Sequence, residues 1–411
     1  MRFGQAIQHL LTTALLLPHL SLALPATSSP QIPIISSSTT TSPNSTHISP
    51  SLFASLEELA RLVDISYCVG GISVPNTGIQ PPFTCLSRCS DFPAFELITS
   101  WNTGPLLSDS CGYVAYDHNP ANPRIVVAFR GTYSIANTIA DLSTVRQEYV
   151  PYLGEGEGDD EAESPEDAKE HVTPTCTNCT VHTGFLRSWH NTRPVLLPHL
   201  TLALQTHPTY SLVLVGHSLG GAVALLAGLE FRARGWNPQI TTFGEPRVGN
   251  GEFVKHVDDL FVRGEGEESM YRRVTHVDDP VPLLPPTEWG YRPHAGEVFI
   301  AKAGLPPAIT DVFECVGDED KMCSAGADVS LVDEAVGAAA VVVDEEEGEG
   351  ERGPGRNGLE KRGIIPARYK LWQLFFSHRD YFWRLGVCLK GGDPWDWKGT
   401  YPAYEVGMDE L

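Results

Sequence analysis

A serine between two glycines is the first group in this sequence that could do covalent chemistry. The motif G-H-S-L-G at residues 216–220 follows an apolar run at 212–215 and precedes small and apolar residues. Because the chain contains 38 glycines, the motif alone is weak, and the predicted strand before it and helix after it carry the interpretation. A serine at such a strained turn is a nucleophile for acyl transfer, so Ser218 is the predicted nucleophile. His217 is interpreted as structural because it points elsewhere at such a turn.

A serine reacts only when a base, oriented by an acid, removes its proton. In the order typical of this turn, the acid and then the base follow the serine along the chain. Asp278 and Asp279 both end a predicted strand where prolines force a loop. Of the fourteen histidines, only His294 and His378 come later. Order alone modestly favours His378, which lies between aromatic residues that could shield it from water.

The elements that must position these groups alternate along the chain. Apolar runs predict strands at residues 112–116, 124–129, 211–216, 239–243, 271–275 and 297–301. Helical spacing predicts helices at residues 53–66, 183–206, 219–234 and 250–262. Such alternation indicates an α/β fold, with a mostly parallel central sheet flanked by helices.

The first 50 residues read as export and linker sequence. Arg2 and the apolar residues 10–17, followed by a small-x-small cleavage site, predict a signal peptide over residues 1–23. A proline and a histidine interrupt the apolar run, so a membrane anchor is the weaker interpretation, and no other segment is long enough to span a bilayer. Residues 24–50 are rich in Ser, Thr and Pro and predict a disordered leader.

Nine cysteines in an exported chain favour disulfides. The expected pairs are Cys85–Cys89, Cys176–Cys179 and Cys315–Cys323 by proximity in sequence, with Cys68–Cys388 then joining the two ends of the domain. Cys111 has no sequence neighbour and is expected to be free. Zinc binding at the C-x2-C of 176–179 is disfavoured because the sequence lacks a second such pair and a histidine at ligand spacing. Sequons at Asn44 and Asn178 permit N-glycosylation.

The net charge of −22 is concentrated in two runs. Residues 154–171 hold nine acids and one Lys, or −8, and residues 344–351 hold six acids, or −6, which leaves −8 for the rest. We interpret the first run as an acidic insert, and residues 325–363 as a low-complexity insert that contains the second. A chain this acidic is repelled by nucleic acids and by anionic membranes, so nucleic acid is excluded as a partner.

Six segments occur in the order of a known family. They are FRGTYSI (129–135), VHTGFLRSW (181–189), VGHSLGGA (215–222), FGEPRVGN (243–250), RVTHVDDPVPLLPP (273–286) and SHRDYFWRLGVC (377–388). The chain resembles the filamentous-fungal class 3 lipases, the family of Rhizomucor- and Thermomyces-type lipases and related feruloyl esterases. The resemblance implies an α/β-hydrolase fold with a short lid helix over the active site. It places this domain at residues 51–390, followed by a tail at 391–411.

The resemblance also implies the roles of the reactive groups. Ser218 is the nucleophile, Asp279 the acid and His378 the base, because the family's acid directly precedes an x-V-P step, here at 280–282. The histidines that it excludes from catalysis are His276 and His294. It matches three of the expected disulfides, which are Cys68–Cys388, Cys85–Cys89 and Cys176–Cys179.

Two further features follow from the same resemblance. The oxyanion hole uses the backbone N–H of Leu219 and a second donor after R-G, here Thr132 with its N–H and hydroxyl. A short lid at 134–141 follows, with an apolar stripe that covers the acyl pocket when closed and faces lipid when open. Its residues are Ile135, Thr138 and Ile139. Well-known members carry Trp where this chain has Thr138, which weakens the expectation of strong interfacial activation.

The expected activity is that of a secreted serine lipase, which hydrolyses carboxylic esters of acylglycerols through an acyl-enzyme and needs no metal or organic cofactor. We expect a monomer acting at a lipid–water interface. The alternatives are a carboxylesterase on soluble esters, such as feruloyl esters, and a non-catalytic lipid-binding protein. Lys361-Arg362 is a dibasic pair that suggests processing. The C-terminal residues 408–411 resemble an ER-retrieval signal imperfectly, and secretion is favoured.

Overall fold

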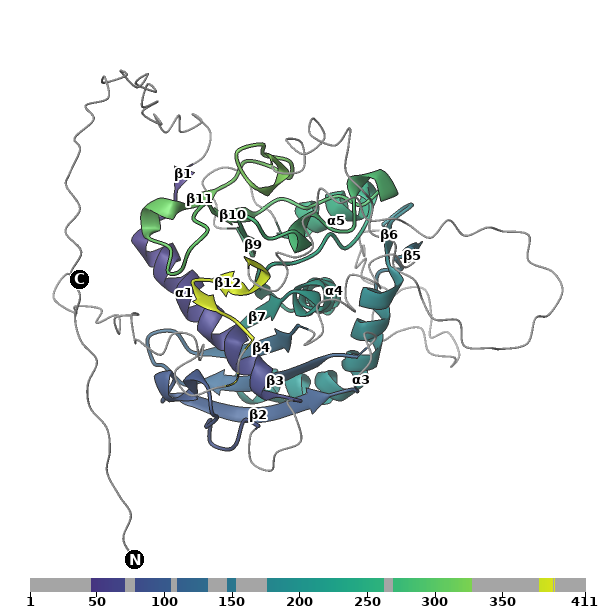
Figure 1. The fold of residues 1–411 in the computed structure, drawn as a ribbon. Coiled ribbons are helices and arrows are strands. Elements are labelled where there is room, and N and C mark those ends of the chain that lie inside the picture. Colours follow the sequence, from purple (N-terminus) through teal and green to yellow (C-terminus); the bar gives the residue numbers. More distant parts are fainter. Residues whose placement is uncertain are drawn as a thin grey trace, which may run out of the picture. The chain divides into compact units, whose positions relative to one another are not determined.

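A nine-stranded sheet forms the centre of the described protein (Figure 1). The computed structural model describes residues 46–70, 78–104, 109–131, 146–152, 176–261, 269–326, 377–386 and 388. The strands of the sheet are β1 (Thr46–His47), β2 (Phe95–Asn102), β3 (Cys111–Asp117), β4 (Arg124–Arg130), β7 (Ser211–His217), β8 (Pro238–Phe243), β9 (Tyr271–His276), β10 (Glu297–Ile300) and β11 (Val312–Glu314). Their order across the sheet is β1-β11-β10-β9-β8-β7-β4-β3-β2.

The middle of this sheet is parallel and its two edges are antiparallel. Strands β4, β7, β8, β9 and β10 run in one direction, whereas β2 and β3 on one side and β11 and β1 on the other pair antiparallel. Two small antiparallel pairs lie outside it. They are β5 (Arg146–Glu148) with β6 (Thr180–His182), and β12 (Asp380–Tyr381) with β13 (Trp383–Arg384). The predicted α/β fold with a mostly parallel sheet is confirmed.

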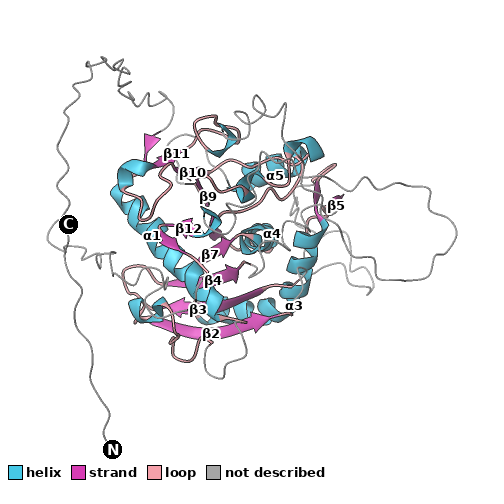
Figure 2. Ribbon diagram, viewed as in Figure 1, coloured by secondary structure: helices cyan, strands magenta, loops and turns pink. Residues whose placement is uncertain are grey.

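Helices cover both faces of the sheet (Figure 2). The longer ones are α1 (Pro50–Ile65), α3 (Thr183–Thr206), α4 (Leu219–Ala233) and α5 (Gly251–Phe261), and two of the single 3-10 turns are η1 (Ser66–Cys68) and η8 (Ser377–Arg379). Side chains of a strand point alternately to its two faces. In β4, Val127 and Phe129 therefore pack in the cluster that contains α3, α4 and α5, while Val126 and Ala128 pack in the cluster that contains α1.

Regular secondary structure is present before residue 50, earlier in the chain than predicted. Residues 46–47 pair with β11, and α1 starts at Pro50 rather than at residue 53. The reason is local, because the Ser49 hydroxyl accepts the N–H of Leu52 as an N-cap, and a proline is well suited to the first turn. The prediction of a disordered leader through residue 50 is therefore wrong for its last residues.

Most other elements match the prediction within two residues, and the edges of the sheet are the exception. β2 was not predicted because its side chains alternate only weakly between buried and exposed positions. β11 and β1 are two or three residues long, too short for a periodic signal. These edge strands extend the sheet without contributing to the strand ends where Ser218 and Asp279 lie.

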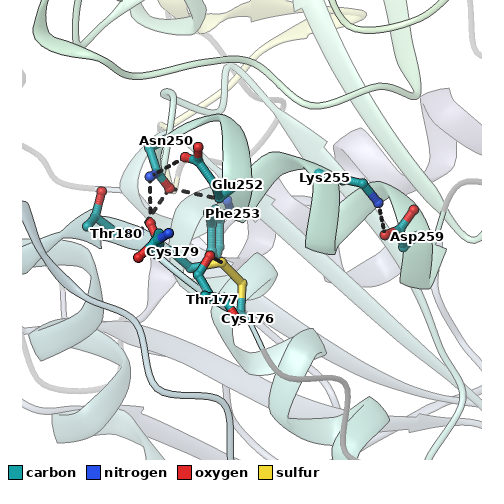
Figure 3. The surroundings of a disulfide bond; sticks show 10 residues. Cys176, Thr177, Cys179, Thr180, Asn250, Glu252, Phe253, Lys255 and Asp259 are labelled. Atoms are coloured by element: carbon teal, nitrogen blue, oxygen red, sulfur yellow. Dashed lines mark hydrogen bonds and ion pairs between the residues drawn. A yellow bond between two sulfur atoms is a disulfide. The ribbon is translucent and has the colours of Figure 1, made fainter.

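All four expected disulfides are bonded in the structure, and Cys111 is free and buried. Figure 3 shows the bond between Cys176 and Cys179 beside the start of α5. The Asn250 side chain accepts the N–H of Thr180 at 2.9 Å and donates to the Asn178 carbonyl at 2.8 Å. This small disulfide loop is thereby joined to the helix that follows β8.

Several predictions concern residues outside the described ranges. They are the signal peptide, residues 24–45 of the leader, Thr132, the lid at 134–141, the acidic insert at 154–171, residues 327–363 of the second insert and the tail at 391–411. In the part of the chain that the structure describes, no helix combines the length and apolarity needed to cross a membrane.

Candidate active site

Ser218 lies at a strained turn between β7 and α4. Its φ of 56° and ψ of −130° are rare for any residue other than glycine, and such strain clusters at functional sites. The backbone N–H of Ser218 donates to the Phe243 carbonyl at 2.9 Å, which ties the turn to the end of β8. A Cβ at Gly220 would lie 2.4 Å from the Phe129 carbonyl oxygen. The glycine is therefore required for α4 to pass this close to β4.

Leu219 is the first residue of α4, directly after the serine. The N–H groups of a first helical turn have no acceptor within the helix, and they carry the positive end of its dipole. Gly131, the residue directly after β4, lies beside this turn. A Cβ on Gly131 would come within 3.0 Å of the Ser218 Cβ and 2.9 Å of the His217 carbonyl. The residue that follows, Thr132, lies outside the described residues.

The two neighbouring aspartates have different environments. Asp278 is exposed and has a positive φ of 68°, which turns the chain after β9. Asp279 is buried, and its N–H donates to the His276 carbonyl at 3.1 Å. Only Asp279 faces His378, whose Nδ1 lies 2.9 Å from Asp279 Oδ2 and 3.1 Å from Oδ1.

This pairing fixes the tautomer of His378. A carboxylate accepts hydrogen bonds, so Nδ1 of His378 carries the proton and donates it to Asp279. The lone pair of neutral His378 is then on Nε2. That atom is buried and has no hydrogen-bond partner among the described residues. Nε2 of His378 can therefore accept a proton from a group other than Asp279.

Three donors converge on the Asp279 carboxylate. Besides His378, the Val281 N–H donates to Oδ1 at 2.9 Å, and the Tyr381 hydroxyl donates to Oδ2. Burial by itself raises the pKa of Asp279, but the charge of protonated His378 and these hydrogen bonds lower it below its ordinary value. Asp279 is therefore ionised at neutral pH. Burial and the Asp279 charge raise the pKa of Tyr381 well above its usual range, so this hydroxyl remains a donor.

Gly244 allows His378 and Asp279 to lie against the serine turn. It follows Phe243, which binds the Ser218 N–H, and has a φ of +58°. A Cβ here would lie 2.9 Å from His378 Cε1 and 3.0 Å from Asp279 Oδ2. Phe243, at the end of β8, therefore contacts Ser218, and the next residue, Gly244, lies against His378 and Asp279.

We expected His217 to point away from the site, but its side chain points toward His378. Its ring stacks on that of His378, with centroids 4.7 Å apart and an angle of 30° between the planes. Its Nε2 lies 2.8 Å from the His378 carbonyl oxygen, and its Nδ1 lies 2.5 Å from the Tyr67 hydroxyl. Sequence reasoning missed both Tyr67 and Tyr381. For Tyr381 a signal was present, since it lies three residues after the base in an aromatic segment.

The alternative base, His294, pairs with a different carboxylate. Its Nε2 lies 3.4 Å from Glu245 Oε1, and the two residues line a small pocket together with Leu225 of α4. The other oxygen of Glu245 accepts the hydroxyls of Thr242 and Tyr271, both at 2.6 Å. Burial raises the pKa of Glu245, but His294 and the two hydroxyls lower it overall. This network is separate from Asp279.

A metal site is not formed by the described residues. The one group of ligand-type side chains close enough together is that of Glu297, Cys315 and Cys323. Both of these cysteines are joined in a disulfide, so neither offers a thiolate. The arrangement around Ser218 instead consists of a strained serine, a buried histidine and a buried carboxylate.

Known proteins share this architecture and sequence. A family profile described as Lipase (class 3) matches residues 126–289. Secreted mono- and diacylglycerol lipase 2 of Gibberella zeae is 51% identical over 389 residues, which covers 90% of this chain and 90% of that protein. Lipase A of Sodiomyces alcalophilus is 48% identical over 388 residues, covering 87% and 88%.

Solved structures agree with these relatives. The crystal structure of Lip2 lipase from Yarrowia lipolytica matches with a TM-score of 0.63 and 31% sequence identity, over 84% of this chain and 98% of that chain. Lipase II from Rhizopus niveus matches with a TM-score of 0.52 and 27% identity, over 69% and 91%. A shared fold, a matching family profile and about half of all residues in common with relatives matched over most of their length leave one assignment: this chain belongs to the class 3 lipase family and is a lipase-type ester hydrolase.

Proposed function

We propose that this protein is a secreted serine lipase that hydrolyses the ester bonds of mono- and diacylglycerols, with Ser218, His378 and Asp279 as its catalytic residues. The observation that carries the proposal is the buried His378–Asp279 pair, with Nδ1 and Oδ2 2.9 Å apart, against the strained serine turn. The substrate class is that of the Gibberella zeae relative, which is named a secreted mono- and diacylglycerol lipase.

In the first half of the reaction, Ser218 Oγ attacks the ester carbonyl and its proton passes to His378 Nε2. Asp279 holds the imidazole through Nδ1 and stabilises the imidazolium that forms. His378 then gives the proton to the departing glycerol oxygen, and the acyl group remains on Ser218. In the second half, water gives a proton to His378 Nε2 and attacks the acyl carbonyl. The bond between the acyl group and Ser218 Oγ then breaks, His378 returns the proton to Oγ, and the fatty acid is released.

The negative oxygen of each tetrahedral intermediate needs two donors. The N–H of Leu219, at the start of α4, is one of them, and the proposal assigns the other to the N–H and hydroxyl of Thr132. The contact of Gly131 with the serine turn supports this assignment because Thr132 is the next residue. The segment with Ile135, Thr138 and Ile139 is proposed as the lid at the lipid–water interface, where the enzyme acts as a monomer.

Secretion is supported by two independent observations. The Gibberella zeae relative is named as secreted, and the described residues hold four disulfides, which form in oxidising compartments. We therefore assign residues 1–23 to a signal peptide. Asn178 is exposed at its turn and is available for an N-linked glycan.

The proposal is tested by comparing wild-type protein with Ser218→Ala on a diacylglycerol emulsion and on a soluble short-chain ester. We expect wild type to hydrolyse both, with a rise in rate once the acylglycerol exceeds its solubility, and Ser218→Ala to lose at least about 10³-fold on both. Ser188→Ala is the matched control, because Ser188 is also buried but donates only to the Asp109 carbonyl, at 3.2 Å.

Each outcome has a distinct meaning. Full activity in Ser218→Ala would overturn the mechanism. Activity on the soluble ester without a rise at the emulsion would replace the lipase with a carboxylesterase. Lipid binding without hydrolysis by either protein would favour a non-catalytic lipid-binding protein.

A further inference from the structure

His217 is hydrogen-bonded at both ring nitrogens, and one of its partners is the catalytic base. The His378 carbonyl oxygen, 2.8 Å from His217 Nε2, can only accept a hydrogen bond. Nε2 therefore carries the proton, and Nδ1 is an acceptor. The Tyr67 hydroxyl, 2.5 Å from Nδ1, must then be the donor. Tyr67 therefore donates to His217, and His217 donates to the backbone carbonyl of His378.

The environment holds His217 in this one tautomer. All three residues are buried, and the His217 ring stacks on the His378 ring. Burial lowers the pKa of His217 to about 3, and the charge of protonated His378 acts in the same direction. His217 is thus neutral over the working range of the enzyme. A neutral ring with one acceptor and one donor links Tyr67 to the base without adding a charge to the site.

Tyr67 contacts more than His217. A Cβ on Gly131 would lie 2.5 Å from the Tyr67 hydroxyl, so this hydroxyl lies against the chain that leads to the proposed oxyanion donor. Tyr67 also precedes Cys68, which is bonded to Cys388 at the end of the segment that carries the base. His217, in turn, directly precedes Ser218. The pair therefore lies where the serine turn, the end of β4 and the base segment meet.

We propose that Tyr67 and His217 are positioning residues that set the backbone, and thereby the imidazole, of His378 for proton transfer from Ser218. This inference rests on the proposed function, because it assigns a role within that reaction. His378 lies in a single 3-10 turn, which has few internal hydrogen bonds to hold it. Without the donor at His217 Nε2, the His378 carbonyl loses a buried partner and the turn shifts. Small displacements of a reacting group lower kcat sharply, by about 10²-fold for 1 Å.

The experiment compares four variants with wild type: His217→Leu, His217→Gln, Tyr67→Phe and the double variant Tyr67→Phe/His217→Leu. Each preparation is first titrated with a p-nitrophenyl alkylphosphonate, so that kcat refers to competent serines only. A soluble short-chain ester is used, which removes interfacial effects. The control is Tyr113→Phe, since the Tyr113 hydroxyl is equally buried but donates to the Leu62 carbonyl, at 2.9 Å, away from the site.

We expect His217→Leu to lower kcat per titrated site between about 10- and 100-fold with little change in KM. His217→Gln places an amide N–H near the position of Nε2 and should recover most of that loss. Tyr67→Phe should lower kcat about 3- to 10-fold, in line with the loss of one hydrogen bond. Because Tyr67 acts through His217, the double variant should be no slower than His217→Leu alone. Tyr113→Phe should match wild type per site.

Other results would overturn the inference. If the variants titrate fewer sites but keep the wild-type kcat per site, the two residues are only structural. If the effects of Tyr67→Phe and His217→Leu multiply, or if Gln gives no recovery, the proposed chain of hydrogen bonds does not act on the base. An inactive wild-type protein that fails to react with the phosphonate would instead refute the proposed function itself.

Discussion

Ser218 directly follows a strand in the parallel part of the sheet, whereas His378 lies on a short segment late in the chain and outside that sheet. The serine turn joins β7 to α4, and nearly every residue of both elements is buried. The segment from Ser377 to Gly386 contains one 3-10 turn and the small pair β12–β13 (Figure 1). The sheet therefore positions the proposed nucleophile directly, while the proposed base depends on contacts with other elements.

Besides the contacts with Asp279 and His217, the segment is held by α1 and its C-terminal turn. Trp383 Nε1 donates to Glu57 Oε1 at 2.7 Å, and the Gly386 N–H donates to Asp64 Oδ1 at 2.9 Å. The Phe382 ring packs edge-on against Phe53, with centroids 5.3 Å apart. The Cys68–Cys388 disulfide spans 320 residues of sequence. The proposed nucleophile is thus positioned by neighbouring sequence, and the proposed base by contacts between residues far apart in the chain.

The largest effect on rate is expected from Asp279→Asn, which alters only the base side. The new amide would donate to His378 Nδ1 and move the proton to Nε2, so that no lone pair faces Ser218. We expect kcat to fall about 10⁴-fold with the fold retained. Asp278→Asn is the control, because Asp278 is exposed and does not face His378. Ester hydrolysis and circular dichroism measure both, and a loss below tenfold in Asp279→Asn would refute the assignment of the acid.

Gly244→Ala tests the place where the two regions meet. The added Cβ would lie 2.9 Å from both His378 Cε1 and the Tyr381 hydroxyl, and the φ of +58° is unfavourable for alanine. We expect kcat to fall about 10²-fold through displacement of the base. Gly235→Ala also imposes a positive φ, of 80°, but nothing lies within 4 Å of its Cβ. It should cost stability alone, and equal losses of kcat in both variants would show that backbone strain rather than contact is responsible.

The difference between local and long-range positioning explains which parts of the site could be predicted from the sequence. The serine turn is readable because an apolar strand, a glycine-flanked serine and a small-residue helix follow one another within about twenty residues. The strand and helix boundaries around it match the prediction within one or two residues. The preference for Asp279 over Asp278 needed the family resemblance, and its physical reason is burial with three hydrogen-bond donors.

The contacts that hold the base were not predictable in this way. Tyr67 lies 150 residues from His217 along the chain, and no periodicity links them. His217 was interpreted as pointing elsewhere because the backbone of a typical turn suggests it, whereas its ring stacks on a residue that arrives from far along the sequence. Side-chain pairs of this kind are set by tertiary packing, which a single sequence does not encode as a local pattern.

Tyr381→Phe is expected to have a smaller effect on rate, about tenfold, because Asp279 keeps two of its three donors. The pKa of Asp279 is lower in the folded protein than in the unfolded chain, so its ionised form stabilises the fold above the unfolded value of about 3.9. This contribution disappears as the pH falls through the folded-state pKa. Removing a donor to the carboxylate raises that pKa and should cost about 1.5–3 kcal/mol at pH 7.

Urea unfolding at pH 7 and pH 3 checks this sign. The difference between wild type and Tyr381→Phe should be largest at pH 7 and should shrink as the pH is lowered, because it is lost once Asp279 is protonated in the folded protein. Tyr113→Phe removes a hydroxyl bonded to a backbone carbonyl, so its cost should be the same at both pH values. A pH-independent loss in Tyr381→Phe would mean that its hydroxyl does not stabilise an ionised Asp279.

The smallest effect on rate is expected when both Cys68 and Cys388 are changed to Ser, although the effect on stability is large. At 25 °C the hydrogen bonds from α1 still hold the base segment, so kcat should stay within about twofold of wild type. Opening a loop of 320 residues should lower the free energy of unfolding by about 2–5 kcal/mol. Removing Cys315–Cys323, whose loop spans 8 residues, should cost less.

Hydrogen exchange on the variant that lacks Cys68–Cys388 separates the two regions: protection should fall first in residues 377–386 and persist in β7. Equal loss of protection in both would show that residues 377–386 and the sheet open as one unit. The two regions would then differ in their contacts but would have the same stability.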